Sequence, residues 1–259
     1  MKRHTFSRRD VIRGSTAIAA SGAFASVTSA APPASAVTPQ LIAAAKKEAR
    51  VVYYTSIDLP VAERIAKAFE AKYSGIAVRV ERSGAERVFQ RIGQEYASRI
   101  HSVDVVNSSD AAHFIVWKRE GMLEPYLPDD VAQYYPAEHK DPDGAFASFR
   151  AWLCVIGYNT SMVKAEEAPK SYADLLDPKW MGKIVKAHPS YSGTIMTATY
   201  QMARDLGWDY FDKLSKQKVM QVQSSADPPK KLALGERAVM ADGNEYNMFI
   251  EKELSLIHI

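Results

Sequence analysis

Strand-like and helical patterns alternate between residues 51 and 121, and this alternation restricts the possible folds of the chain more than any other feature. Short β-rich apolar runs predict strands at Val51–Tyr54, Ile76–Val80 and Val103–Val106. Predicted helices follow these strands at 60–73, 83–98 and 111–120. Strands joined by helices pair in parallel, and the helices cover both faces of the sheet. We therefore predict an α/β lobe in which ligands lie at the carboxyl ends of the strands.

The alternation resumes after residue 148 and predicts a second lobe. A segment rich in Pro, Asp and Tyr at 125–144 is expected to be an irregular surface connection. The apolar run Phe149–Tyr158 is expected to be one long strand that crosses into the second lobe. Further strands are expected at 183–186 and 238–241, and helices near 174–180, 194–206, 207–211 and 230–234. The predicted boundaries are 37–148 for the first lobe and 149–253 for the hinge strand and an incomplete second lobe.

Residues 1–36 predict a secretory signal peptide. Arg8 and Arg9 form a twin-arginine pair, and an uncharged stretch rich in Ala, Ser, Thr and Gly follows. The stretch ends in the small-x-small cleavage site Ala34-Ser35-Ala36. The arginine pair favours the twin-arginine route, which implies a periplasmic protein. No stretch of about 20 residues is apolar enough for a membrane-spanning helix.

Removing this signal changes the charge of the chain. The full sequence has 33 Lys and Arg against 30 Asp and Glu, a net charge of +3. Residues 1–36 contain five of the basic residues and one acidic residue, so the remaining residues carry a net charge of −1. A near-neutral chain without a basic stripe argues against binding to nucleic acid.

Short motifs after residue 36 occur in the order of a known family. The two most specific are PKSYADL at Pro169–Leu175 and DPKWMGKI at Asp177–Ile184. Weaker ones lie at 51–56, 103–110, 121–126, 157–160, 192–194 and 234–236. Through these motifs the chain resembles the type II solute-binding proteins of ABC importers, in the branch that contains the ferric-iron-binding proteins. The resemblance implies an α/β, two-lobed periplasmic-binding-protein fold, in which each lobe is a mostly parallel sheet flanked by helices and crossing strands form the hinge.

The resemblance also implies a function in transport rather than catalysis. Proteins of this family capture a small solute in the cleft between their lobes and deliver it to the permease of an ABC importer in the inner membrane. For this chain it implies a monomeric binding protein without a cofactor or catalytic residues. The expected solute is a small anionic or polar molecule.

Ferric iron is the alternative solute. Iron-binding members of the branch use paired adjacent tyrosines of the second lobe, often with a histidine or a carboxylate of the first, and such oxygen ligands suit Fe(III). The matching stretch here, Asp242–Asn247, contains Glu245 and Tyr246 and therefore one tyrosine. The loop at 55–59 contains no histidine. We therefore expect no metal site.

Small polar residues after the predicted strands are the candidates for solute binding. Ser192-Gly193-Thr194 begins a predicted helix, whose free N–H groups and dipole attract an oxyanion. The matching segment of iron-binding relatives holds the accompanying anion. The competing interpretation is that the serines only cap helices. The complete set of expected ligand-binding residues is Ser56, Ser83, Gly84, Asp110, Ser192, Gly193, Thr194, Glu245 and Tyr246.

A secreted hydrolase is the alternative from another class of function, and turnover would distinguish it from a binding protein. The sequence offers it little support, because Ser83-Gly84-Ala85 lacks the G-x-S-x-G context of a nucleophile elbow. The histidines His101, His113, His139 and His188 are scattered, which argues against a zinc site. The lone Cys154 lies in an apolar run and is expected to be a small buried hydrophobic residue.

The final residues, Leu254–Ile259, form an unusual string, LSLIHI. It resembles the translation of a transposase adapter that is used to build sequencing libraries. We expect a non-native tail and a natural chain that continues. A genuine short tail is the alternative.

Overall fold

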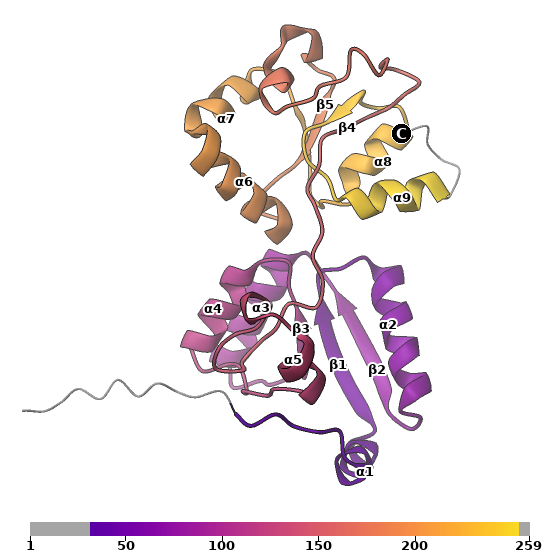
Figure 1. The fold of residues 1–259 in the computed structure, drawn as a ribbon, viewed down its shortest axis with the longest axis vertical. Coiled ribbons are helices and arrows are strands. Elements are labelled where there is room, and N and C mark those ends of the chain that lie inside the picture. Colours follow the sequence, from indigo (N-terminus) through magenta and orange to yellow (C-terminus); the bar gives the residue numbers. More distant parts are fainter. Residues whose placement is uncertain (1–31, 254–259) are drawn as a thin grey trace, which may run out of the picture. The chain divides into compact units, whose positions relative to one another are not determined.

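The computed structural model describes residues 32–253. Its first lobe contains the predicted alternation of strands and helices. Its elements are α1 (Pro39–Glu48), β1 (Arg50–Thr55), α2 (Leu59–Lys72), β2 (Ala77–Arg82), α3 (Ala85–Ala97), β3 (Val105–Asn107) and α4 (Ala111–Arg119). The strand order is β2-β1-β3, and β1 pairs in parallel with both neighbours. Because β1 is central, the crossovers to β2 and on to β3 run in opposite directions. Right-handed crossovers then place α2 and α3 on opposite faces of the sheet, as Figure 1 shows.

The core of this lobe lies between the sheet and helices α3 and α4. Alternate residues of β1, Val52 and Tyr54, are buried against Val88 of α3 and Trp117 of α4. Successive side chains of a strand point to opposite faces, so this pair faces the same helices. The helices therefore hold β1 rigidly, and its carboxyl end presents the loop that begins at Ser56.

The second sheet has strand order β4-β7-β5-β6. β4 pairs with β7 antiparallel, whereas the other two pairings are parallel. The strands are β4 (Gly157–Tyr158), β5 (Ile184–Ala187), β6 (Met220–Val222) and β7 (Val239–Met240). The helices are α6 (Gly193–Leu206), α7 (Trp208–Ser215), α8 (Asp227–Ala233) and α9 (Glu245–Glu253), with 3-10 turns η2 (Ala173–Leu176) and η3 (Pro178–Trp180). The expectation of two mostly parallel sheets flanked by helices is confirmed.

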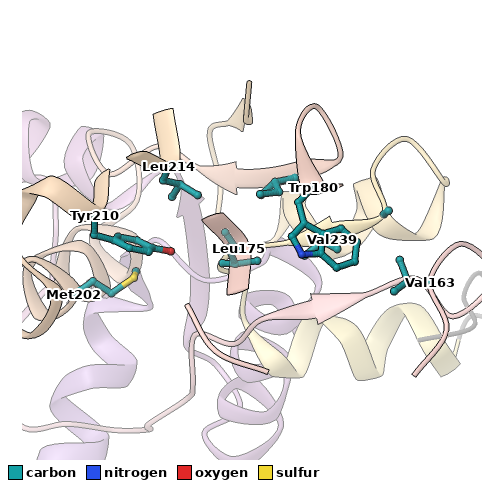
Figure 2. Packing of buried hydrophobic residues seen from close by; sticks show 10 residues of the cluster. Val163, Leu175, Trp180, Met202, Tyr210, Leu214 and Val239 are labelled. Carbon is teal, nitrogen blue, oxygen red and sulfur yellow. The ribbon is translucent and has the colours of Figure 1, made fainter. Parts of the chain in front are cut away.

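Two buried clusters cover the faces of this sheet. Ile184 and Val239 belong to the larger cluster, whose other members include side chains from α6, α7, η2 and η3 (Figure 2). Their chain neighbours Val185 and Met240 pack on Leu232 of α8. The alternation along β5 and β7 therefore assigns each neighbour to a different core. Figure 1 accordingly shows α6 and α7 on one side of the sheet and α8 and α9 on the other.

Two local expectations were wrong, and one strand was not predicted. The run Phe149–Tyr158 is not one long strand: only Gly157–Tyr158 forms a strand, and Cys154 makes a single bridge to Asn244. Apart from this bridge, the segment at 149–156 makes two backbone hydrogen bonds to residues 243–245, at Leu153 and Val155, so no ladder forms along its length. The connection at 125–144 is not wholly irregular, because it contains α5 (Asp129–Tyr134) and a 3-10 turn, η1 (Ala137–His139). β6 was not predicted, since three residues are too few for a periodic signal.

Most of the predicted signal peptide, residues 1–31, and the predicted adapter-derived tail, Leu254–Ile259, lie outside the described residues. Within the cleavage motif, Ser35 bonds to the first lobe: its N–H donates to Leu127 O (2.8 Å), and its carbonyl accepts from Asp129 N (3.2 Å). Cleavage after Ala36 stays a prediction. Between residues 32 and 253, no helix is long and apolar enough to span a membrane.

Candidate functional site

A cavity of about 200 Å³ lies where the carboxyl ends of both sheets meet. Its lining comes from the loops after β1, β2, β3, β5 and β6, from the first turn of α3 and from the start of α6. Arg150 and Trp152 of the crossing segment, and Asn244 and Tyr246 after β7, complete it. This is the position at which α/β sheets bind ligands, as the strand pattern predicted.

The predicted binding residues divide into two groups. The residues that line the cavity are Ser56, Gly84, Ser192, Thr194 and Tyr246. Those that are not among its lining residues are Ser83, Asp110, Gly193 and Glu245.

The residues of the second group have protein partners instead. The Asp110 carboxylate accepts from Ala112 N (2.9 Å) and caps α4. Glu245 Oε2 accepts from Leu153 N (2.7 Å) of the crossing segment. Ser83 continues the β1–β2 ladder, because its N–H donates to Thr55 O (3.0 Å). These contacts assign the residues structural roles that residue type alone did not reveal.

The start of α6 contacts the first lobe directly. Ser192 Oγ caps the helix by accepting from Ile195 N (3.5 Å), and Thr194 N donates to Ser109 Oγ (3.1 Å). A Cβ at Gly193 would lie 2.8 Å from Asp110 Cβ and 3.0 Å from Ser109 Oγ. The protein atoms nearest to this position belong to the first lobe. The N–H groups of Thr194 and Ile195 donate within the chain, and Ser192 both caps the helix and lines the cavity.

A carboxylate of the first lobe accepts hydrogen bonds from two side chains of α9 at the wall of the cavity. Asp58 Oδ2 accepts from Tyr246 Oη (2.9 Å) and from Asn247 Nδ2 (2.8 Å). Burial raises the pKa of Tyr246, and the Asp58 charge raises it further, because both disfavour the phenolate. Tyr246 is the single tyrosine in the stretch that matches the tyrosine pair of iron-binding relatives, and here it is a neutral hydrogen-bond donor.

Three arginines line the cavity, and the sequence analysis missed all of them: Arg82, Arg87 and Arg150. Arg82 Nε donates to Ile57 O (3.2 Å), and Arg87 lies in the first turn of α3. The Arg150 guanidinium lies over the rings of Trp152 (4.2 Å) and Tyr246 (5.0 Å). None of the three pairs with a carboxylate of residues 32–253. Arg82 could have been found, since it directly precedes Ser83 at a strand end, whereas nothing in the sequence links Arg150 to this site.

Three buried polar atoms of cavity-lining residues lack a hydrogen-bond partner among the described residues. They are Ser56 Oγ, Arg150 Nε and Asn244 Oδ1. A hydroxyl both donates and accepts, the arginine nitrogen only donates, and the amide oxygen only accepts. Buried polar groups are normally paired, so each of these atoms lacks the partner that such a group usually has.

A second polar cluster contains one of the scattered histidines, His113. Oxygen and nitrogen atoms of Glu86, Asp110 and His113 lie within 4.8 Å of one another. Both ring nitrogens of His113 are engaged, one with Ser108 Oγ (2.7 Å) and one with Glu86 Oε1 (3.0 Å). The Ser108–His113–Glu86 order resembles a catalytic triad. However, none of these side chains is among those that line the cavity, so no nucleophile or metal ligand faces a substrate space there.

Comparisons with known proteins agree with this architecture. The family model described as bacterial extracellular solute-binding protein matches residues 102–240. The probable ABC transporter periplasmic-binding protein y4fP of Sinorhizobium fredii is 27% identical over 153 residues, covering 56% of this chain and 42% of that protein. Iron uptake protein A1 of Synechocystis is 30% identical over 112 residues, covering 43% of this chain and 30% of that protein. The chain therefore aligns with less than half the length of these two relatives.

A solved structure is similar over more of the chain. The periplasmic binding protein AfuA from Actinobacillus pleuropneumoniae, with exogenous fructose-6-phosphate bound, superposes with a TM-score of 0.70 at 27% identity. The match covers 80% of this chain and 67% of that protein.

Proposed function

Because the chain belongs to the family of bacterial extracellular solute-binding proteins, we propose that it is the substrate-binding component of an ABC importer. It captures a small anionic solute in the cavity between its two lobes, in the periplasm, and delivers the solute as a monomer to the permease. The relatives named as ABC transporter and periplasmic binding proteins support this role.

The observation that carries the choice of an anion is the set of unpaired arginines. Arg82, Arg87 and Arg150 bring three positive charges to one cavity, whereas Asp58 and Asp227 bring two negative ones. Both carboxylates already accept hydrogen bonds from the protein. Guanidinium groups match the geometry of phosphate and carboxylate oxygens, and a cleft concentrates their field. The bound fructose-6-phosphate of the AfuA structure is an organic anion of this kind.

The same charges oppose ferric iron as the solute. A trivalent cation beside three arginines is repelled, and the one phenol available, Tyr246, already donates to Asp58. The name of the iron uptake relative keeps iron as the alternative. A ferric complex with a tyrosinate charge-transfer band that disappears in Tyr246→Phe would favour that alternative.

Calorimetric titration of the purified protein with phosphate monoesters, carboxylates and Fe(III) tests the proposal. We expect saturable binding of an organic anion, and Arg150→Gln and Arg87→Gln should each weaken it by tenfold or more, because a hydrogen bond to a charged group contributes about 1.5–3 kcal/mol. Arg64→Gln removes the same charge from an exposed position on α2 and should leave binding unchanged. Anion binding that is equal in all three variants would disprove this placement of the site.

Export by the twin-arginine pathway is part of the proposal. Arg8 and Arg9 precede the uncharged segment that ends at Ala36. Replacing both arginines by lysine should leave uncleaved precursor in the cytoplasm, measured by fractionation and immunoblotting. An unchanged periplasmic yield would exclude this route of export.

A further inference from the structure

We propose that the solute carries a hydrogen-bond donor, a hydroxyl or a protonated amino group, on the same carbon skeleton as its oxyanion, and that Asn244 Oδ1 accepts this hydrogen bond. The inference rests on the proposed function and names the chemical class of the solute. An organic phosphate or carboxylate with such a donor fits, whereas inorganic phosphate or a simple alkyl acid fits less well.

The orientation of the Asn244 amide follows from its neighbours. The Asp58 carboxylate only accepts hydrogen bonds, so the Asn247 atom beside it, at 2.8 Å, must be the donor Nδ2. Asn247 Oδ1 then faces Asn244 and requires a donor, which is Asn244 Nδ2 at 3.2 Å. The network thus determines both amide orientations from one fixed charge.

This orientation directs the amide nitrogen of Asn244 to the protein and leaves its oxygen unpaired. Nδ2 also donates to Ser225 Oγ at 3.0 Å. Oδ1 is buried and has no partner among residues 32–253, although only 3% of the residue is exposed. An unpaired buried acceptor of a cavity-lining residue is satisfied when the solute supplies a donor.

Two unpaired groups of the cavity lining therefore require opposite partners. Arg150 Nε is an unpaired donor, and together with Arg82 and Arg87 it requires an oxyanion. Asn244 Oδ1 is an unpaired acceptor and requires an O–H or N–H group. A solute with both groups satisfies both residues, and a cavity of about 200 Å³ suits a small organic molecule rather than a single ion.

Three phosphate esters with a three-carbon skeleton test this inference without any change in the protein. Glycerol 3-phosphate carries hydroxyl groups, 3-aminopropyl phosphate carries an amine, and propyl phosphate carries neither. In calorimetric titrations of the wild-type protein, we expect at least one of the first two to bind tenfold or more tightly than propyl phosphate, because propyl phosphate leaves the acceptor unpaired. The tighter of the two distinguishes a hydroxyl from an amine. Equal affinity for all three overturns the inference.

A variant of Asn244 assigns the preference to its oxygen. Asn244→Leu removes the acceptor, so the preference should disappear while propyl phosphate still binds. Asn244→Asp is no substitute for this variant, because it replaces the donor to Asn247 Oδ1 by a second acceptor. Retention of the preference in a folded Asn244→Leu places the acceptor elsewhere and overturns the assignment.

The outcomes separate this inference from the proposed function. If the three esters bind equally and Arg150→Gln weakens all of them, the anion site stands and only the donor requirement is wrong. If neither these esters nor the carboxylates bind, the proposed function fails, and the inference fails with it.

Discussion

Gly193→Ala should disturb the contact between the start of α6 and the first lobe, and the structure allows its cost to be worked out. The added Cβ would lie 2.8 Å from Asp110 Cβ, 3.0 Å from Ser109 Oγ and 3.1 Å from Ala85 Cβ. Carbon atoms prefer a separation of about 3.5–4.0 Å, so the shortest contact is too close by roughly 0.7 Å or more. The Cβ atoms of Asp110 and Ala85 are fixed by the backbone, whereas Ser109 Oγ can move away only by a χ1 rotation that breaks its hydrogen bond with Thr194 N.

The expected cost combines three effects. Overpacking costs about 1–3 kcal/mol, and separation of Thr194 N from Ser109 Oγ costs about 1 kcal/mol. The better helix propensity of alanine returns about 1 kcal/mol. The net effect is to destabilise the conformation in which the lobes are in contact at Gly193 by roughly 1–3 kcal/mol. A solute that binds this arrangement should therefore bind about five- to hundredfold more weakly, since 1.4 kcal/mol corresponds to a factor of ten.

Solute titration and small-angle X-ray scattering of the same samples measure this effect. Besides the weaker affinity, the variant should have a larger radius of gyration, because separating the lobes relieves the overlap. Gly93→Ala is the matched control: it lies inside α3, and nothing is within 4 Å of its added Cβ. It should change neither quantity and should stabilise the fold slightly through helix propensity. If Gly193→Ala behaves like this control, the close contact at Gly193 does not govern binding.

Three further predictions concern buried groups. Asp242→Asn should lower the free energy of unfolding, measured in urea, by about 3–5 kcal/mol because it leaves Lys186 buried without its ion pair. Glu236→Gln removes one partner of the more exposed Lys231–Glu236 pair and should cost less than about 1 kcal/mol. Similar costs for the two variants would contradict this account. Burial, and then Asp58, raise the pKa of Tyr246 above its usual 10.0. The stabilising contribution of the neutral phenol is therefore complete below pH 10.0 and is lost as the pH rises through the raised pKa. Wild type and Tyr246→Phe should differ in the alkaline limb of their stability profiles, and identical limbs would argue against the Asp58 contact. Burial, reinforced by the Asp242 charge, raises the pKa of the Cys154 thiol to about 12. A disulfide reagent at pH 8 should therefore react with the native protein far more slowly than with the urea-unfolded chain. Equal rates would show that the thiol is accessible.

The periodic elements were predictable because each one depends on neighbouring residues. β1, α2, α4, α6 and α7 begin and end within a few residues of their expected limits. Their apolar spacing and their Pro, Gly and Ser boundaries are local signals. The crossing segment at 149–156 misled the prediction because its apolar composition is that of a strand, while strand formation depends on a partner that lies elsewhere in the chain.

The candidate site was predictable only in part. Ser56, Gly84 and Ser192 could be placed near the cavity because the ends of parallel strands meet at one edge of a sheet. Gly193 was expected to bind the solute, and the structure adds that a Cβ at this position would meet Asp110 and Ala85. A sequence shows that a position excludes a Cβ, whereas only the packed structure shows which atoms exclude it.

The sequence by itself determined the fold class, the strand-end location of the site and the resemblance to solute-binding proteins, because periodicity, turn residues and motifs act over short distances along the chain. Only the tertiary structure decided which charges meet in the cavity and which polar atoms stay unpaired. Arg82 and Arg150 lie far apart in the sequence, and the orientation of Asn244 depends on Asp58 through Asn247. Such contacts form when distant segments pack together, and no local pattern records them.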